Sequence, residues 1–200
     1  MIMKTKLFTL IFGAILFASC QQKEMKISRS DFSIVTEMTD FSPAYILKNE
    51  EGKVEIKKNS LIGNTHWVLS VDRDLTLNEV APFLHELTEK KHKVGGMHED
   101  TKDIYFVYSD TIHKQNAYVK MPFKKIILEK PPKEEIAKRA YNFFVYSKDS
   151  IEGVYSKVWT KEDYLISFDK NMNFETFIYT LIDLEKQKMS ENVNSEVYVN

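Results

Sequence analysis

Trp67–Leu87, WVLSVDRDLTLNEVAPFLHEL, is the stretch that decides the fold, because a related stretch returns near the end of the chain. Tyr164–Leu184 reads YLISFDKNMNFETFIYTLIDL and aligns with it without a gap, at an offset of 97 residues. The alignment pairs Asp72 with Asp169, directly after an apolar run in each copy. We therefore predict a chain built from two copies of one structural unit.

Each copy is predicted to be a strand followed by an amphipathic helix. Residues 67–71 and 164–168 are almost continuously apolar, which is typical of a strand covered on both faces. Thr76 and Glu79 have the spacing of a capping box, and Asn173 is the expected cap of the second helix. Apolar residues then recur on one helical face, which predicts packing on a sheet. They are Leu77, Val80, Ala81, Leu84 and Leu87 in the first copy, and Phe174, Phe177, Ile178, Leu181 and Leu184 in the second.

The N-terminus has the features of a secretory signal. Lys4 and Lys6 precede an apolar run over residues 7–17, which is shorter than the roughly 20 residues that span a bilayer. The sequence LFASC at residues 16–20 resembles a lipobox, with Phe17 where leucine is usual. We expect a signal peptide over 1–19, acylation (palmitate) of Cys20, and a polar tether over 20–30. The alternative is a plain signal peptide with an incidental cysteine.

The charge of the chain argues against a nucleic-acid partner. Lys4 and Lys6 are the only charged residues in 1–19, so the mature chain would keep 26 of its 28 basic residues against 29 acidic ones. A nearly balanced charge lacks the basic surplus that nucleic acids require. Cys20 is the only cysteine, so once it is acylated no thiol is left for a disulfide or a thiolate metal site.

The remaining segments predict an α+β fold. Residues 44–57 and 104–128 have the alternation and turn residues of β-hairpins, and Pro131-Pro132 marks a break. We divide the chain into a first unit over 31–130 and a second over 131–200. Each is predicted to be a hairpin–strand–helix–strand unit, with helices on a mixed β-sheet.

The strand–helix unit resembles the periplasmic domain of the biopolymer-transport proteins of the ExbD/TolR family. The matching residues are DRDLTL at 72–77 and DKNMNF at 169–174, and the two copies cover about a fifth of the chain. No counterpart of the helix that precedes this strand in that family is found here. The resemblance implies a dimerising interaction module, so two copies in one chain would pack as an intramolecular pseudo-dimer and leave a monomer. The family's energy coupling uses an acidic residue in a transmembrane helix, and it is not carried over.

The sequence offers few residues for catalysis or for a cofactor. Asp72, Asp74 and Asp169 lie at the ends of strands, where α/β enzymes often place catalytic groups, but a role in binding backbone N–H groups of the corner is favoured. His98, followed by Glu99 and Asp100, is the nearest approach to a metal-ligand cluster, and a solvated loop is favoured there. No nucleophile elbow, phosphate-binding loop or dinucleotide fingerprint is present. We expect no cofactor and no metal.

The second half is rich in aromatic residues, and alternation along its strands would leave one aromatic face outside. These residues are Phe143, Phe144, Tyr146, Tyr155, Trp159, Tyr164 and Tyr179. We therefore expect a non-catalytic envelope lipoprotein, on the periplasmic or outer-membrane side, that binds or scaffolds an envelope protein or peptidoglycan. The alternative is a small-ligand-binding protein or hydrolase with a cleft near Asp72, Asp74 and His98.

Overall fold

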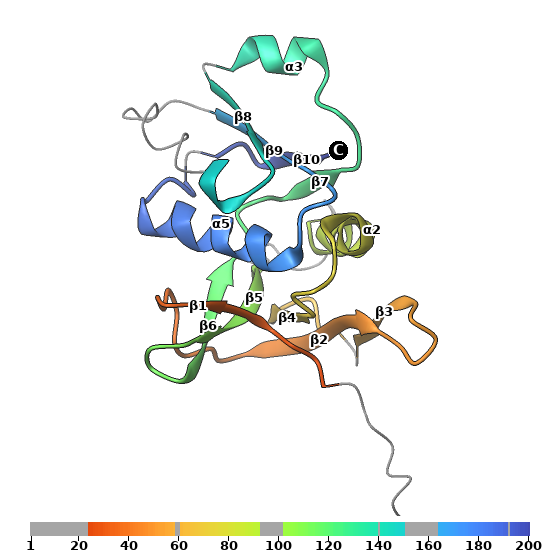
Figure 1. The fold of residues 1–200 in the computed structure, drawn as a ribbon, viewed down its shortest axis with the longest axis vertical. Coiled ribbons are helices and arrows are strands. Elements are labelled where there is room, and N and C mark those ends of the chain that lie inside the picture. The colour runs from red at the N-terminus through yellow and green to blue at the C-terminus, as the bar shows by residue number, and fades with distance from the viewer. Residues whose placement is uncertain (1–23, 59–60, 93–101, 140, 151–163, 192) are drawn as a thin grey trace, which may run out of the picture.

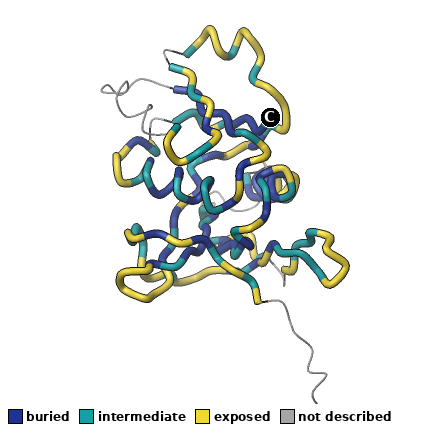
Figure 2. The backbone as a smooth tube through the Cα atoms, viewed as in Figure 1, coloured by how far each residue is buried: buried dark blue, intermediate teal, exposed yellow. Residues whose placement is uncertain are grey.

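The computed structural model describes residues 24–58, 61–92, 102–139, 141–150, 164–191 and 193–200. Its main helices lie between two β-sheets, so the chain forms three layers (Figure 1). Figure 2 shows that buried residues concentrate in the facing sheets and helices, whereas the turns are exposed. Among the described residues, no helix is long and apolar enough to cross a membrane.

The first sheet has six strands in the order β1-β5-β4-β2-β3, with β6 on β5. Strands β2, β4 and β5 are parallel, whereas β3 is antiparallel to β2 and β6 is antiparallel to β5. Strand β6 pairs with one edge of β5. Strands β4 and β1 both pair with the opposite edge of β5, one after the other along its length. The strands are β1 (Ser28–Ser30), β2 (Phe41–Lys48), β3 (Val54–Lys58), β4 (His66–Val71), β5 (Ile104–Asp110) and β6 (Gln115–Lys120).

The second sheet has four parallel strands in the order β7-β10-β9-β8. This order repeats the β1-β5-β4-β2 order of the first sheet. Helix α2 (Leu77–Lys91) connects β4 to β5, and α5 (Phe174–Lys186) connects β9 to β10. The other elements are β7 (Lys125–Ile127), α3 (Lys133–Lys138), β8 (Tyr141–Val145), β9 (Tyr164–Phe168) and β10 (Glu196–Val199). The predicted α+β class, with helices on a mixed sheet, is confirmed.

The corners that precede the two helices bind each other reciprocally. The Leu77 N–H donates to the Met172 carbonyl at 2.8 Å, and the Phe174 N–H donates to the Leu75 carbonyl at 2.7 Å. The two bonds are equivalent in the repeat, because Leu77 aligns with Phe174 and Leu75 aligns with Met172 at the offset of 97 residues. The first N–H groups of an α-helix have no partner within the helix, so here each helix start is satisfied by the other unit.

A second pair of bonds follows the same rule. The Asn78 N–H donates to the Lys170 carbonyl at 2.7 Å, and the Glu175 N–H donates to the Arg73 carbonyl at 3.4 Å. Between the two pairs, Thr76 and Asn173 form an antiparallel β-bridge. We call residues 72–78 and 169–175 the joint, because they connect the two units through the backbone.

Each helix also packs on the sheet of the other unit. Helix α5 contacts β1 and β6, and α2 contacts β7 and β10. Leu84 and Leu181, which the sequence alignment pairs, are both buried, and all the layers share one hydrophobic core. The units are therefore interlocked through side chains as well as through the joint.

Two strands lie outside the segments to which the sequence assigned them. Ser28–Ser30, expected in the tether, form β1, because the end of β5 extends beyond its pairing with β4 and leaves an edge free. Lys125–Ile127, expected to belong to the first unit, pair with β10 of the second sheet. Strand β1 thus precedes the first predicted unit and belongs to the first sheet, and β7 precedes the second predicted unit and belongs to the second sheet.

Candidate functional site

The carboxylates that follow the central strands bind the backbone of their own turns. Asp72 Oδ1 accepts the N–H of Asp74 at 3.1 Å, and Asp169 Oδ1 accepts the N–H of Asn171 at 2.8 Å. Asp72 is buried in this role. The side chains of Asp72 and Asp169 thus have the capping role that the sequence favoured over catalysis.

The helix caps agree with the sequence as well. Thr76 Oγ1 accepts the N–H of Glu79 at 3.3 Å, and the Glu79 carboxylate accepts the N–H of Thr76 at 2.8 Å, which completes the capping box. Burial raises the pKa of Glu79, but hydrogen bonds from Lys48 and Thr76 outweigh it, so the pKa lies below its ordinary value. In the second unit, Asn173 Oδ1 accepts the N–H of Thr176 at 2.9 Å.

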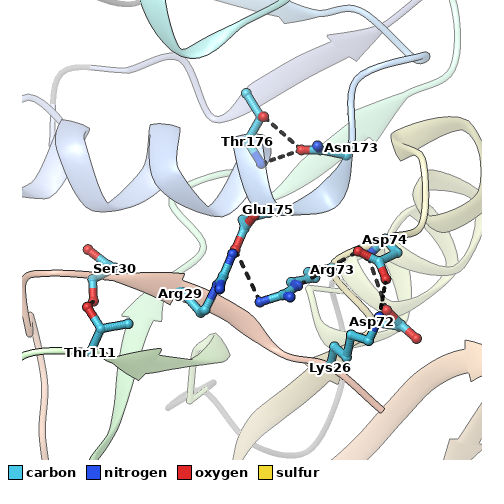
Figure 3. A network of polar contacts seen from close by, with 10 residues as sticks. All are labelled: Lys26, Arg29, Ser30, Asp72, Arg73, Asp74, Thr111, Asn173, Glu175 and Thr176. Atoms are coloured by element: carbon cyan, nitrogen blue, oxygen red, sulfur yellow. Dashed lines mark hydrogen bonds and ion pairs between the residues drawn. The ribbon is translucent and has the colours of Figure 1, made fainter. Parts of the chain in front are cut away.

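A network of charged side chains surrounds the joint and connects the start of the folded chain, residues 26–29, to both units (Figure 3). Lys26 pairs with Asp74 of the first unit at 3.2 Å, and Arg29 pairs with Glu175 of the second at 3.3 Å. Arg73 also approaches Glu175, at 3.8 Å. Exposed ion pairs stabilise a protein only slightly, so the network is better suited to orienting the start of the folded chain than to holding the fold together.

Asp110, which the sequence analysis did not single out, is a buried carboxylate at the end of β5. It accepts hydrogen bonds from the Ser33 hydroxyl and from the N–H groups of Ile112 and His113, at 2.8 and 3.0 Å for the latter two. Its Oδ2 also lies 2.8 Å from His113 Nδ1. Hydrogen bonds from Ser33 and His113 hold the pKa of Asp110 well below its usual range. The signal in the sequence is an Asp at the start of a turn, which is too common to identify a buried group.

Replacing Asp110 with asparagine is expected to change how stability depends on pH. A carboxyl whose pKa is lower in the folded than in the unfolded chain stabilises the fold above its unfolded value of about 4, and this contribution is lost as the pH falls. The asparagine side chain would not titrate, so urea unfolding of Asp110→Asn should show lower stability at neutral pH and a shallower decline between about pH 5 and pH 2. Parallel pH profiles for the two proteins would contradict the role assigned to Asp110.

The histidines are dispersed. His66 Nδ1 accepts the N–H of Asp103 at 3.2 Å, and His85 Nδ1 lies 2.6 Å from the Ile126 carbonyl of β7. His92 ends α2, and burial, with the cations Lys124 and Lys91 nearby, lowers its pKa. His98 lies outside the described residues. Within the described ranges, no group of three or more His, Cys, Asp or Glu side chains could hold a metal ion.

The aromatic residues of the second half divide between the core and the surface. Tyr164 is buried, Phe143 is half-buried, and Phe144 and Tyr146 are exposed residues, at 47% and 60% of their full surface. The centroids of these two exposed rings lie 6.2 Å apart. Residues 155 and 159, which belong to the same predicted set, lie outside the described residues. Phe144 and Tyr146 form an exposed aromatic pair at the end of β8.

No family model, curated protein or solved structure matches this chain. The candidate site is therefore defined by geometry alone. It has two parts: the joint, where backbone and charged side chains connect the units, and the aromatic pair of Phe144 and Tyr146. The carboxylates of the joint bind backbone N–H groups and cations, whereas the aromatic pair exposes apolar surface to solvent.

Proposed function

We propose that this protein is a non-catalytic envelope lipoprotein, anchored to the membrane through Cys20, that binds or scaffolds another envelope component. The partner is a protein or peptidoglycan, on the periplasmic or outer-membrane side. The observation that carries the proposal is the aromatic pair of Phe144 and Tyr146. Exposed aromatic clusters are typical of binding surfaces, since a large apolar area in water is unfavourable unless a partner covers it.

The aromatic pair lies beside the joint, as does the start of the folded chain. Five residues lie between Cys20 and Lys26, so the two are six steps of the chain apart, at most about 20 Å when extended. The Lys26 carbonyl accepts the N–H of Arg73 at 2.8 Å, so the start of the folded chain is fixed beside the joint. Strand β8 begins toward the far end of the long axis and ends at the joint, where the Val145 carbonyl accepts the N–H of Asp169 at 2.8 Å (Figure 1). The aromatic pair flanks Val145, so both the pair and the start of the folded chain lie beside the joint.

The proposal includes an internal pseudo-dimer, which would make the protein a monomer. Its support is the reciprocity of the joint: the hydrogen bond donated by Leu77 to the second unit has its equivalent in the bond donated by Phe174 to the first. The equal strand order of the two sheets adds to this support. In the ExbD/TolR-like interpretation, two chains would pair where this protein uses two units of one chain.

Photo-crosslinking in intact cells tests the proposal. A photoreactive amino acid at Tyr146 is expected to form a discrete adduct with one envelope component, because this side chain belongs to the aromatic pair. The matched control is Tyr45, which is 43% exposed on β2 of the first sheet. The absence of an adduct at position 146, or the same adducts from both positions, would contradict the proposal.

A further inference from the structure

The first sheet presents exposed aromatic residues on the side that faces away from the helices. Successive residues of a strand point to opposite faces, and the buried Ala44 and Ile46 of β2 belong to the shared core. Phe41 and Tyr45 of the same strand therefore point outward, and they are 41% and 43% exposed. Figure 1 shows α2 and α5 on the inner side of this sheet, and no helix of the described residues lies beyond its outer side.

The neighbouring strands continue this apolar surface. Pro43 of β2 pairs with Val68 of β4, which pairs in turn with Tyr105 of β5. Val107 of β5 pairs with Tyr118 of β6. Residues paired across neighbouring strands point to the same face, and Val68 and Val107 are buried without belonging to the shared core. We call this surface the outer face, and its main residues are Phe41, Tyr45, Val68, Tyr105, Val107 and Tyr118.

The lysines of the outer face are paired with carboxylates. The strand register places Lys57 and Lys120 on this face. Lys57 pairs with Glu55 at 3.4 Å, and Lys120 pairs with Asp103 at 2.8 Å. The outer face therefore attracts a partner through its rings and apolar side chains more than through net charge. Aromatic rings of this kind are typical of the interface between a bilayer and water, where an apolar body and a polar tip are both accommodated.

The start of the folded chain is fixed next to the outer face. The Arg73 N–H donates to the Lys26 carbonyl at 2.8 Å, and the N–H of the preceding residue, Asp72, donates to the Ile46 carbonyl of β2 at 3.0 Å. One corner thus holds both the start of the folded chain and the strand that carries the exposed rings. Because Cys20 lies at most about 20 Å from Lys26 along the chain, an acylated Cys20 would keep the outer face close to the bilayer.

We propose that the outer face rests on the surface of the bilayer to which Cys20 is anchored, with the rings of Phe41 and Tyr45 among the lipid headgroups. This inference rests on the proposed lipid anchor and adds an orientation to it. The first sheet faces the membrane, and the second sheet, at the other end of the long axis, faces away from it (Figure 1). The apolar surface that the bilayer covers then supplements the acyl chains in holding the protein on the membrane.

Photo-crosslinking to phospholipids in intact cells tests the proposal. A photoreactive amino acid replaces Tyr45, and the phospholipids carry radioactive phosphate in their headgroups, so that acyl groups on Cys20 do not contribute to the signal. The matched control is Ile136, which is 40% exposed on α3 at the far end of the long axis. We expect a phospholipid adduct at position 45 that is at least about tenfold stronger than at position 136. A high-salt wash before irradiation should leave the adduct unchanged, because the lysines of the outer face are paired.

A charged substitution on the outer face provides a second measurement. Phe41→Asp should weaken the phospholipid adduct at position 45 several-fold, whereas Phe144→Asp, at an exposed ring of β8, should not. Both substitutions are at exposed positions, and circular dichroism would verify that each variant is folded.

The outcomes separate this inference from the lipid anchor. A protein in the membrane fraction that forms no phospholipid adduct at position 45, or forms one equal to that at position 136, would show that the outer face does not rest on the bilayer while the anchor stands. A protein adduct at position 45 in place of the phospholipid adduct would also overturn the inference, by assigning the outer face to a protein partner. A protein found only in the soluble fraction would overturn both the anchor and the orientation.

Discussion

Replacing Phe177 with alanine is expected to lower the free energy of unfolding by about 3–5 kcal/mol, the usual cost of removing a buried aromatic ring. Phe177 on α5 is fully buried, and its ring lies 5.9 Å from that of Phe106 in the first sheet and 5.1 Å from that of Phe168 in the second. The cavity would therefore open between both sheets at once. Urea unfolding measures the loss.

The matched control for Phe177→Ala is Phe144→Ala, which removes an exposed ring from β8 of the second sheet. Phe144→Ala should cost less than about 1 kcal/mol, because surface substitutions rarely cost more. Both variants should unfold in a single transition, since one core connects the layers. A loss below about 1 kcal/mol for Phe177→Ala would mean that the sheets do not share this ring.

Replacing Cys20 with alanine is expected to move the protein from the membrane fraction to the soluble fraction. Two or more acyl chains, at about 0.8 kcal/mol per buried CH₂ group, give stable attachment, whereas one chain gives only marginal binding. Fractionation with a high-salt wash, followed by immunoblotting, measures the distribution. The control is Ser19→Ala, which keeps a small residue before the cysteine and should leave the protein on the membrane. Retention of Cys20→Ala through the wash would contradict the lipid anchor.

The strand–helix units could be predicted because their signals are local. Each signal depends on residues close together in the chain. These signals are the apolar runs before Asp72 and Asp169, the helix caps at Thr76 and Asn173, and the apolar face of each following helix. Such patterns follow from the geometry of strands and helices alone. The same alignment also identified Leu84 and Leu181 as equivalent core positions, and both are buried.

The parts that could not be predicted depend on contacts between distant segments. Three-residue strands such as β1 and β7 carry no periodicity, so only their pairing with β5 and β10 defines them. The bonds of the joint are formed by backbone atoms, which every residue possesses, and no residue type marks them. Asp110 is likewise recognisable only once Ser33 and His113 surround it.

The reciprocal bonds of the joint also bear on whether one unit could be stable alone. A unit on its own would leave the N–H groups of Leu77 and Asn78, or of Phe174 and Glu175, without the carbonyls that accept them here. It would also expose the helix face that packs on the opposite sheet. These N–H groups would then have to bind water instead. The two units are therefore complementary without being alike: Pro82 and Tyr179 occupy equivalent positions and differ in character.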